Sequence, residues 1–166
     1  AGLPTARKPR RMSNPLIRAL IGLEIFQGLR PLQITEILRQ AERIVFQPGQ
    51  VIVQAGTAGD SAVIVVGGDA VLLDESGAPL EAVPEGSILS ELAMLIEHET
   101  RATVVARGPV RAIRITRAAL QAQMLHDPAL AEHFVERIAG RLTAIAEELQ
   151  RIDAALRAIQ TTPKVA

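Results

Sequence analysis

The spacing of apolar residues changes from helical to strand-like near residue 42 and returns to helical near residue 116. Before the first change, residues 15–25 and 31–41 have the pattern of two short amphipathic helices, each with a proline near its first turn, and FQGL at 26–29 separates them. Between the two changes, short apolar runs alternate with turn residues. The pattern predicts helices at both ends of the chain and a β-rich segment between them.

The β-rich segment predicts many short strands joined by turns, which is typical of a sandwich or a closed roll. The strands are expected around Ile44, around Val51, and at residues 62–66, 70–73, 80–83, 103–106 and 110–115. We expect GGD at 67–69 and the Gly108-Pro109 pair to make two hairpins. Gly49 and Gly68 are expected at positive φ, which only glycine adopts freely.

The last part of the chain predicts two helices. Thr116 caps the first, which ends near Leu125, and Asp127-Pro128 opens a long helix that ends near Gln160. Apolar residues recur along the long helix at alternating spacings of four and three: Ile138, Leu142, Ile145, Leu149, Ile152, Leu156 and Ile159. This heptad seam predicts a partner, most simply a second copy in a parallel coiled coil. The alternative is that the seam packs back along its own roll.

Composition and charge exclude several classes of protein. The absence of cysteine excludes disulfides, zinc–thiolate sites and iron–sulfur clusters. A net charge of zero and only three aromatic residues, all phenylalanine, give no basis for a nucleic-acid surface. No apolar run is long enough to span a membrane, so the expected location is the cytoplasm.

The stretch from Gly86 to Val104 carries the candidate chemistry. Ser90 and Glu91 open a short apolar run that predicts a helix, with Ser90 as N-cap. The N–H groups at a helix N-terminus attract a phosphate, and Arg101 follows ten residues after Glu91 to pair with the same phosphate. Glu91 only accepts hydrogen bonds, so it suits a sugar hydroxyl. Phosphate plus ribose suggests a nucleotide; the alternative is a surface ion pair.

This stretch resembles the phosphate-binding cassette of the cyclic nucleotide-binding domain family. The matching positions are Gly86, Leu89, Ser90, Glu91, Leu92, Ala93, Met94, Arg101, Ala102, Thr103 and Val105. The resemblance extends over roughly residues 16–142 through Phe26, Gln27, Gly28, Leu29, Phe46, Pro48, Gly49, Gln50, Ile52, Gly56, Asp60 and Gly68. The loop length between Glu91 and Arg101 is similar to that of the bacterial catabolite activator branch.

The resemblance implies a mainly β fold: an eight-stranded β-roll, or jelly-roll, with N-terminal helices and a long C-terminal dimerisation helix. Together with the basic, proline-containing composition of the first residues, it predicts a disordered basic arm at 1–14, the nucleotide-binding roll with its N-terminal helices at 15–126, the long helix at 127–160 and a tail at 161–166. The arm has a second interpretation, an electrostatic contact with anionic lipid, nucleic acid or an acidic partner.

The resemblance also assigns site residues. Those expected at the ligand are Ser90, Glu91, Leu92, Leu89, Arg101, Ala102 and Thr103. The helix positions expected near the base are Leu142, Thr143, Ile145 and Ala146. The sequence departs from the family where Ser90 replaces glycine and Leu89 replaces phenylalanine, and it departs from the catabolite activator branch where Ile145-Ala146 replace a base-reading Thr-Ser pair.

The function expected from these residues is a non-enzymatic sensor of cyclic AMP or cyclic GMP that signals through its C-terminal helix as a homodimer. No catalytic motif is found, no cofactor or metal is expected because the three histidines are dispersed, and no DNA-binding domain is expected after the helix. Two alternatives stay open: a ligand-independent dimerisation scaffold with a degenerate pocket, and the regulatory domain of a longer channel, kinase or enzyme.

Overall fold

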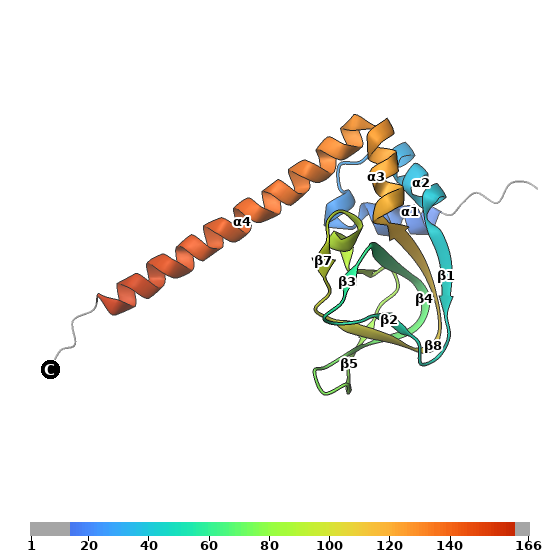
Figure 1. Ribbon diagram of the computed structural model, residues 1–166, viewed down its shortest axis with the longest axis horizontal. Helices are drawn as coiled ribbons and strands as arrows, with labels where there is room; N and C mark the ends of the chain where they lie inside the picture. The colour runs from blue at the N-terminus through green and yellow to red at the C-terminus, as the bar shows by residue number, and fades with distance from the viewer. Residues whose placement is uncertain (1–13, 162–166) are drawn as a thin grey trace, which may run out of the picture.

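The computed structural model describes residues 14–161 and consists of a β-roll, a group of helices at one end of it, and one long helix that extends away (Figure 1). The helices are α1 (Asn14–Ile21), η1 (Glu24–Phe26), α2 (Pro31–Gln40), η2 (Glu91–Met94), α3 (Arg117–His126) and α4 (Pro128–Gln160). Apart from residues 14 and 161, the predicted basic arm and tail lie outside the described residues.

Within the described residues the roll has eight strands, all paired antiparallel, which confirms the predicted fold. The strands are β1 (Glu42–Phe46), β2 (Val51–Val53), β3 (Ala58–Gly59), β4 (Ser61–Leu73), β5 (Pro79–Val83), β6 (Ile88–Leu89), β7 (His98–Glu99) and β8 (Thr103–Thr116). The larger sheet runs β1-β8-β4-β5, with β2 on β8 and β6 on β4, and β3 pairs with β7. Since α4 alone has 33 residues, more of the described chain is helix than strand.

Two predicted hairpins are wrong, because β4 and β8 are continuous strands of 13 and 14 residues that pair with each other along their length. The glycines at 67 and 68 lie where the register between them shifts, so they form a bulge and not a turn. A Cβ on Gly68 would lie 2.1 Å from the Pro109 carbonyl oxygen, so glycine lets the two bent strands approach closely. Gly68 and Gly49 have φ of +115° and +87°, which confirms their predicted conformation.

The first predicted helix is shorter than expected. α1 ends at Ile21, and the chain then turns through η1, which buries Ile25 and Phe26. The predicted helices at 31–41 and 116–125 are confirmed as α2 and α3, the latter capped by the Thr116 hydroxyl, which accepts the Ala119 N–H at 3.2 Å.

Two clusters of buried side chains form the core. One lies between the helices and the roll and includes Phe26 and Phe134, whose rings meet edge to face at 6.2 Å between centroids. The other fills the roll and includes Phe46, Val65 and Val110. Through the phenylalanine pair, the first turns of α4 become part of the body of the protein.

The long helix α4 has an anchored first part and an exposed second part. Asp127 caps its start by accepting the Leu130 N–H at 3.2 Å, and Gln33 on α2 donates to the same carboxylate at 3.0 Å. Every residue from Leu142 through Gln160 is exposed, including the predicted heptad seam from that point on. Across residues 14–161, no helix has the combination of length and hydropathy that a membrane span requires.

Candidate functional site

The candidate cassette is a loop between β6 and β8 that contains the 3₁₀ turn η2 and the short strand β7. The predicted helix is reduced to η2, Glu91–Met94, whose Ala93 and Met94 are fully buried. The Arg117 guanidinium, at the start of α3, donates to the Ala93 carbonyl at 3.0 Å and to the Gly59 carbonyl at 2.7 Å. The cassette is therefore held in place by its buried residues Ala93 and Met94 and by the hydrogen bonds from Arg117.

The prediction that the Ser90 side chain caps this turn is wrong, because its hydroxyl makes no cap hydrogen bond. Ser90 has φ +54° and ψ +43°, and among the described residues it is the one non-glycine with positive φ. Its hydroxyl instead lies 2.8 Å from the Thr100 hydroxyl. The first hydrogen bond of the turn runs from the Ala93 N–H to the Ser90 carbonyl. The N–H groups of Glu91 and Leu92 come before this bond and have no partner within the turn.

Thr100 and Thr103 join the cassette to the loop at 54–60. The Thr100 carbonyl accepts the Gly56 N–H at 2.8 Å and its N–H donates to the Thr57 carbonyl at 3.0 Å, while its side chain is only 9% exposed. Thr103, the first residue of β8, accepts the Ala55 N–H on its hydroxyl at 3.0 Å. The sequence prediction included Thr103 but missed Thr100.

Arg101 lies in the irregular segment between β7 and β8, with its side chain exposed. Of the residues described, none forms an ion pair with it. Ala102 is half-buried beside it, and Leu89 and Leu92 are half-buried on either side of the Ser90-Glu91 pair, where Leu89 packs against the core of the roll. Arg101 is thus a cation that remains available at the edge of the loop.

Glu91 is paired with the long helix and not with Arg101. Its Oε1 lies 2.5 Å from Nη2 of Arg141 on α4, and the two side chains are 27% and 33% exposed. An ion pair at this exposure is screened by water and contributes about 1 kcal/mol or less. Its importance is positional, because it connects the cassette directly to α4. Arg141 was missed by the sequence prediction.

A cavity of about 240 Å³, here called the inner cavity, reaches from the cassette into the roll. It is lined by Ser90 and Thr100, by strand residues such as Ile52 and Val63, and by Arg114. Arg114 pairs with Glu42 at 3.6 Å. It has the same strand parity as Ala112 and Val110, which face the core of the roll, so strand parity is the sequence signal that could have identified it as an inward-facing charge.

The four helix residues expected near a base do not reach the inner cavity. Leu142, Thr143, Ile145 and Ala146 are all exposed, and none lines it. The Thr143 hydroxyl donates to the Ala139 carbonyl of its own helix at 3.0 Å. Within residues 14–161, no three histidine or acidic side chains are grouped as a metal site would require.

Comparisons with known proteins agree with this arrangement. The family model described as cyclic nucleotide-binding domain matches residues 43–127, just over half of the chain. A regulatory subunit of a cAMP-dependent protein kinase from Mucor circinelloides f. lusitanicus is 32% identical over 110 residues, which cover 64% of this chain and 25% of that protein. The chain therefore spans about a quarter of the length of this curated relative.

Solved structures share the fold. The N-terminal domain of a transcriptional regulator from Streptomyces coelicolor A3(2) superposes with a TM-score of 0.69 at 21% identity, covering 79% of this chain and 94% of that chain. A cyclic nucleotide-binding-like protein from Brucella abortus superposes with a TM-score of 0.62 at 27% identity, covering 69% of this chain and all of that chain.

Proposed function

The chain belongs to the cyclic nucleotide-binding domain family, and from that premise we propose that it is a non-enzymatic sensor of cyclic AMP or cyclic GMP. The cyclic phosphate binds between Arg101 and the N–H groups of Glu91, Leu92 and Ala102. The ribose 2′-hydroxyl donates to Glu91.

The observation that carries this proposal is the state of Arg101. Its guanidinium is exposed and has no ion-pair partner among the described residues, although the cassette around it is held by Ser90, Thr100 and Thr103. A cation left unpaired beside a fixed loop with free N–H groups is suited to a small anion. By contrast, Arg117, which stabilises the cassette, donates to two backbone carbonyls.

Glu91 supports the ribose contact and offers a route for the signal. Its ion pair with Arg141 engages Oε1, and a carboxylate has further acceptor capacity for a hydroxyl. When a nucleotide binds Glu91, any shift of the Glu91 carboxylate acts directly on its ion-pair partner Arg141 and so on α4. The positions of Arg141 and the α4 residues beyond it then depend on whether the ligand is present.

Self-association through α4 completes the proposed sensor. The seam residues from Leu142 to Ile159 are each at least half exposed, which is unfavourable for an isolated helix in water. A second copy aligned in parallel would cover this seam and form a homodimer. Ligand-dependent repositioning of α4 would then reach the partner protomer.

The experiment is a calorimetric titration of cyclic AMP and cyclic GMP into nucleotide-stripped protein, beside Arg101→Ala and a control, Arg107→Ala. Arg107 is also an exposed arginine near the start of β8, but it pairs with Asp69 at 3.3 Å. Loss of the phosphate's counter-charge in Arg101→Ala should cost about 2–4 kcal/mol of binding, and the control should bind normally. Equal affinity in both variants would remove Arg101 from the site.

The second candidate function is a ligand-independent dimerisation scaffold. It is favoured by the apolar Ile145-Ala146 pair and by the inner cavity of about 240 Å³, which is smaller than the usual ligand site of about 300–1,000 Å³. No heat from either nucleotide, with association retained in sedimentation, would select the scaffold.

A third candidate, the regulatory domain of a longer protein, is supported by the match to a quarter of a kinase regulatory subunit.

A further inference from the structure

A second and larger cavity, of about 620 Å³, lies apart from the cassette and shares no lining residue with the inner cavity. It opens beside α1 on β1, β4 and β8, and we call it the outer cavity. Its volume is within the range of sites that hold small organic ligands. Neither Glu91 nor Arg101 lines it.

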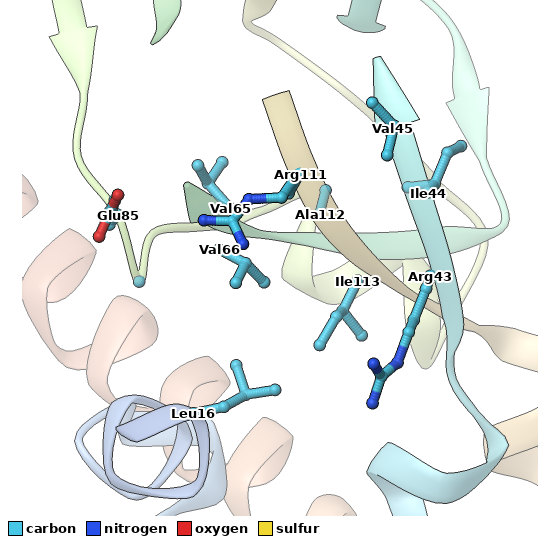
Figure 2. Close-up of a pocket in the computed structure, with 11 residues that line it drawn as sticks. Leu16, Arg43, Ile44, Val45, Val65, Val66, Glu85, Arg111, Ala112 and Ile113 are labelled. Carbon is cyan, nitrogen blue, oxygen red and sulfur yellow. The ribbon is translucent and has the colours of Figure 1, made fainter. Parts of the chain in front are cut away.

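The outer cavity is apolar at its centre. Val45 and Ile113 alternate along β1 and β8 with residues that face the core of the roll, so they lie on the other face of the sheet. Leu16 on α1 closes this face from one side. Figure 2 shows Leu16, Val66 and Ile113 pointing into the same space.

Two arginines flank this apolar space. Arg43 and Arg111 lie on the same face of β1 and β8 as Val45 and Ile113, and Figure 2 shows their guanidinium groups on either side of the space. Neither forms an ion pair with any residue from 14 to 161.

One acidic residue, Glu85, also lines the outer cavity. Its Oε1 and the Arg111 Nη2 lie 3.2 and 2.7 Å from the point where a Cβ on Gly67 would stand. Glu85 therefore partly offsets Arg111, whereas Arg43 has no acidic neighbour among the residues that line the cavity. The cavity thus has an apolar body and a net charge of about one positive unit.

We propose that the outer cavity binds an amphiphilic monoanion, an alkyl carboxylate of medium chain length. The alkyl chain packs against Leu16, Val66 and Ile113, and the guanidinium groups of Arg43 and Arg111 attract the carboxylate. A carboxylate matches the net charge better than a phosphate dianion does. The site is independent of the nucleotide cassette, so neither proposal depends on the other.

Charge separates this occupant from the nearest alternative, the chain's own first 13 residues. That segment leads directly into α1 and contains Arg7, Lys8, Arg10 and Arg11. Placing it against Arg43 and Arg111 would bring like charges together, which is unfavourable. An anionic ligand has the opposite, complementary charge.

The test is calorimetric titration of dodecanoate, below its micelle concentration, into the full chain, with and without excess cyclic AMP. We expect one site per chain, with affinity rising about fourfold per added methylene from octanoate to dodecanoate. Arg43→Gln and Arg111→Gln should each weaken binding about five- to tenfold. Arg107→Gln, on the same strand as Arg111 but outside the cavity, should bind as the unmodified chain does.

A filling variant separates this cavity from the exposed seam of α4, which also attracts apolar chains. Val45→Trp fills the mouth from an exposed position, so the fold is retained and dodecanoate binding is lost. Binding that survives Val45→Trp, equal binding of dodecanol, or no binding to a folded chain would overturn the proposal. So would binding that requires removal of residues 1–13, since that segment would then be the occupant.

Discussion

The backbone at Ser90 allows a quantitative prediction about the cassette. With φ at +54°, Ser90 has a left-handed conformation that costs an L-residue about 1–2 kcal/mol relative to glycine. Its hydroxyl recovers part of this cost through the 2.8 Å contact with the Thr100 hydroxyl, since such a bond contributes about 0.5–1.5 kcal/mol. Replacing Ser90 by glycine removes both effects at once.

The balance predicts different results for glycine and alanine. Ser90→Gly gains about 1–2 kcal/mol by removing strain, loses the hydrogen bond, and gives the unfolded chain about 0.4–1 kcal/mol of extra entropy, so its stability stays near that of the unmodified chain. Ser90→Ala keeps the strain, loses the bond and leaves the buried Thr100 hydroxyl without its partner. Because both variants lose this bond, they differ only by the strain that alanine keeps and the unfolded-state entropy that glycine adds, so Ser90→Ala should be less stable than Ser90→Gly by about 1 kcal/mol.

The assay is urea unfolding at one fixed protein concentration, since association through α4 would otherwise change the apparent stability. A double-mutant cycle with Thr100→Val isolates the hydroxyl pair, and we expect a coupling of about 0.5–1.5 kcal/mol between the two positions. Additive losses in the cycle, or Ser90→Ala as stable as Ser90→Gly, would refute this reasoning.

Three further predictions concern the roll, the link to α4 and pH. Gly68→Ala should cost about 3 kcal/mol or more in urea unfolding, because its Cβ meets a carbonyl of β8, whereas Gly77→Ala, with φ +84° and open space around it, should cost only about 1–2 kcal/mol. Arg141→Gln should weaken cyclic AMP about fivefold in calorimetry by releasing Glu91, and should leave 2′-deoxy cyclic AMP unaffected. The pKa of Asp127 is lowered below 3.8, chiefly by the hydrogen bond from Gln33 on α2. The stability that this carboxylate contributes is therefore complete above pH 3.8 and is lost as pH falls through the lower pKa of the folded state. Asp127→Asn should flatten this part of the pH–stability curve.

Local signals in the sequence were sufficient for the helices with strong caps. Asp127-Pro128 combines an N-cap side chain with a proline at the first helical position, and α4 begins there. The Thr116 hydroxyl caps α3, which begins without a proline. At these sites the backbone bonds depend on residues within one turn, so no tertiary information was needed.

The same local signals were misleading at residues 67–69 and 108–109. Glycine at positive φ is equally compatible with a tight hairpin turn and with a bulge in a longer strand. The choice depends on which strand lies alongside, and here β4 and β8 bend together where Gly68 meets Pro109. That pairing joins residues about 40 positions apart, which no local window reveals.

In the candidate site, too, local features could be predicted from the sequence and a long-range contact could not. The order of Ser90, Glu91 and Arg101 could be found from the sequence because these residues lie in one loop. Arg141 contacts Glu91 from a helix 50 residues further along the chain, and its own neighbourhood on α4 contains no signal for that contact.

The most direct test of the sensor is amide NMR of the isotope-labelled chain during titration with cyclic AMP, with 5′-AMP as a control that lacks the cyclic phosphate. Contact with a phosphate changes the N–H groups that bind it. The account predicts saturable shifts that are largest at Glu91, Leu92 and Ala102 and that extend to Arg141 on α4. Shifts absent from these residues, or of equal size with 5′-AMP, would contradict a cyclic nucleotide site in this cassette.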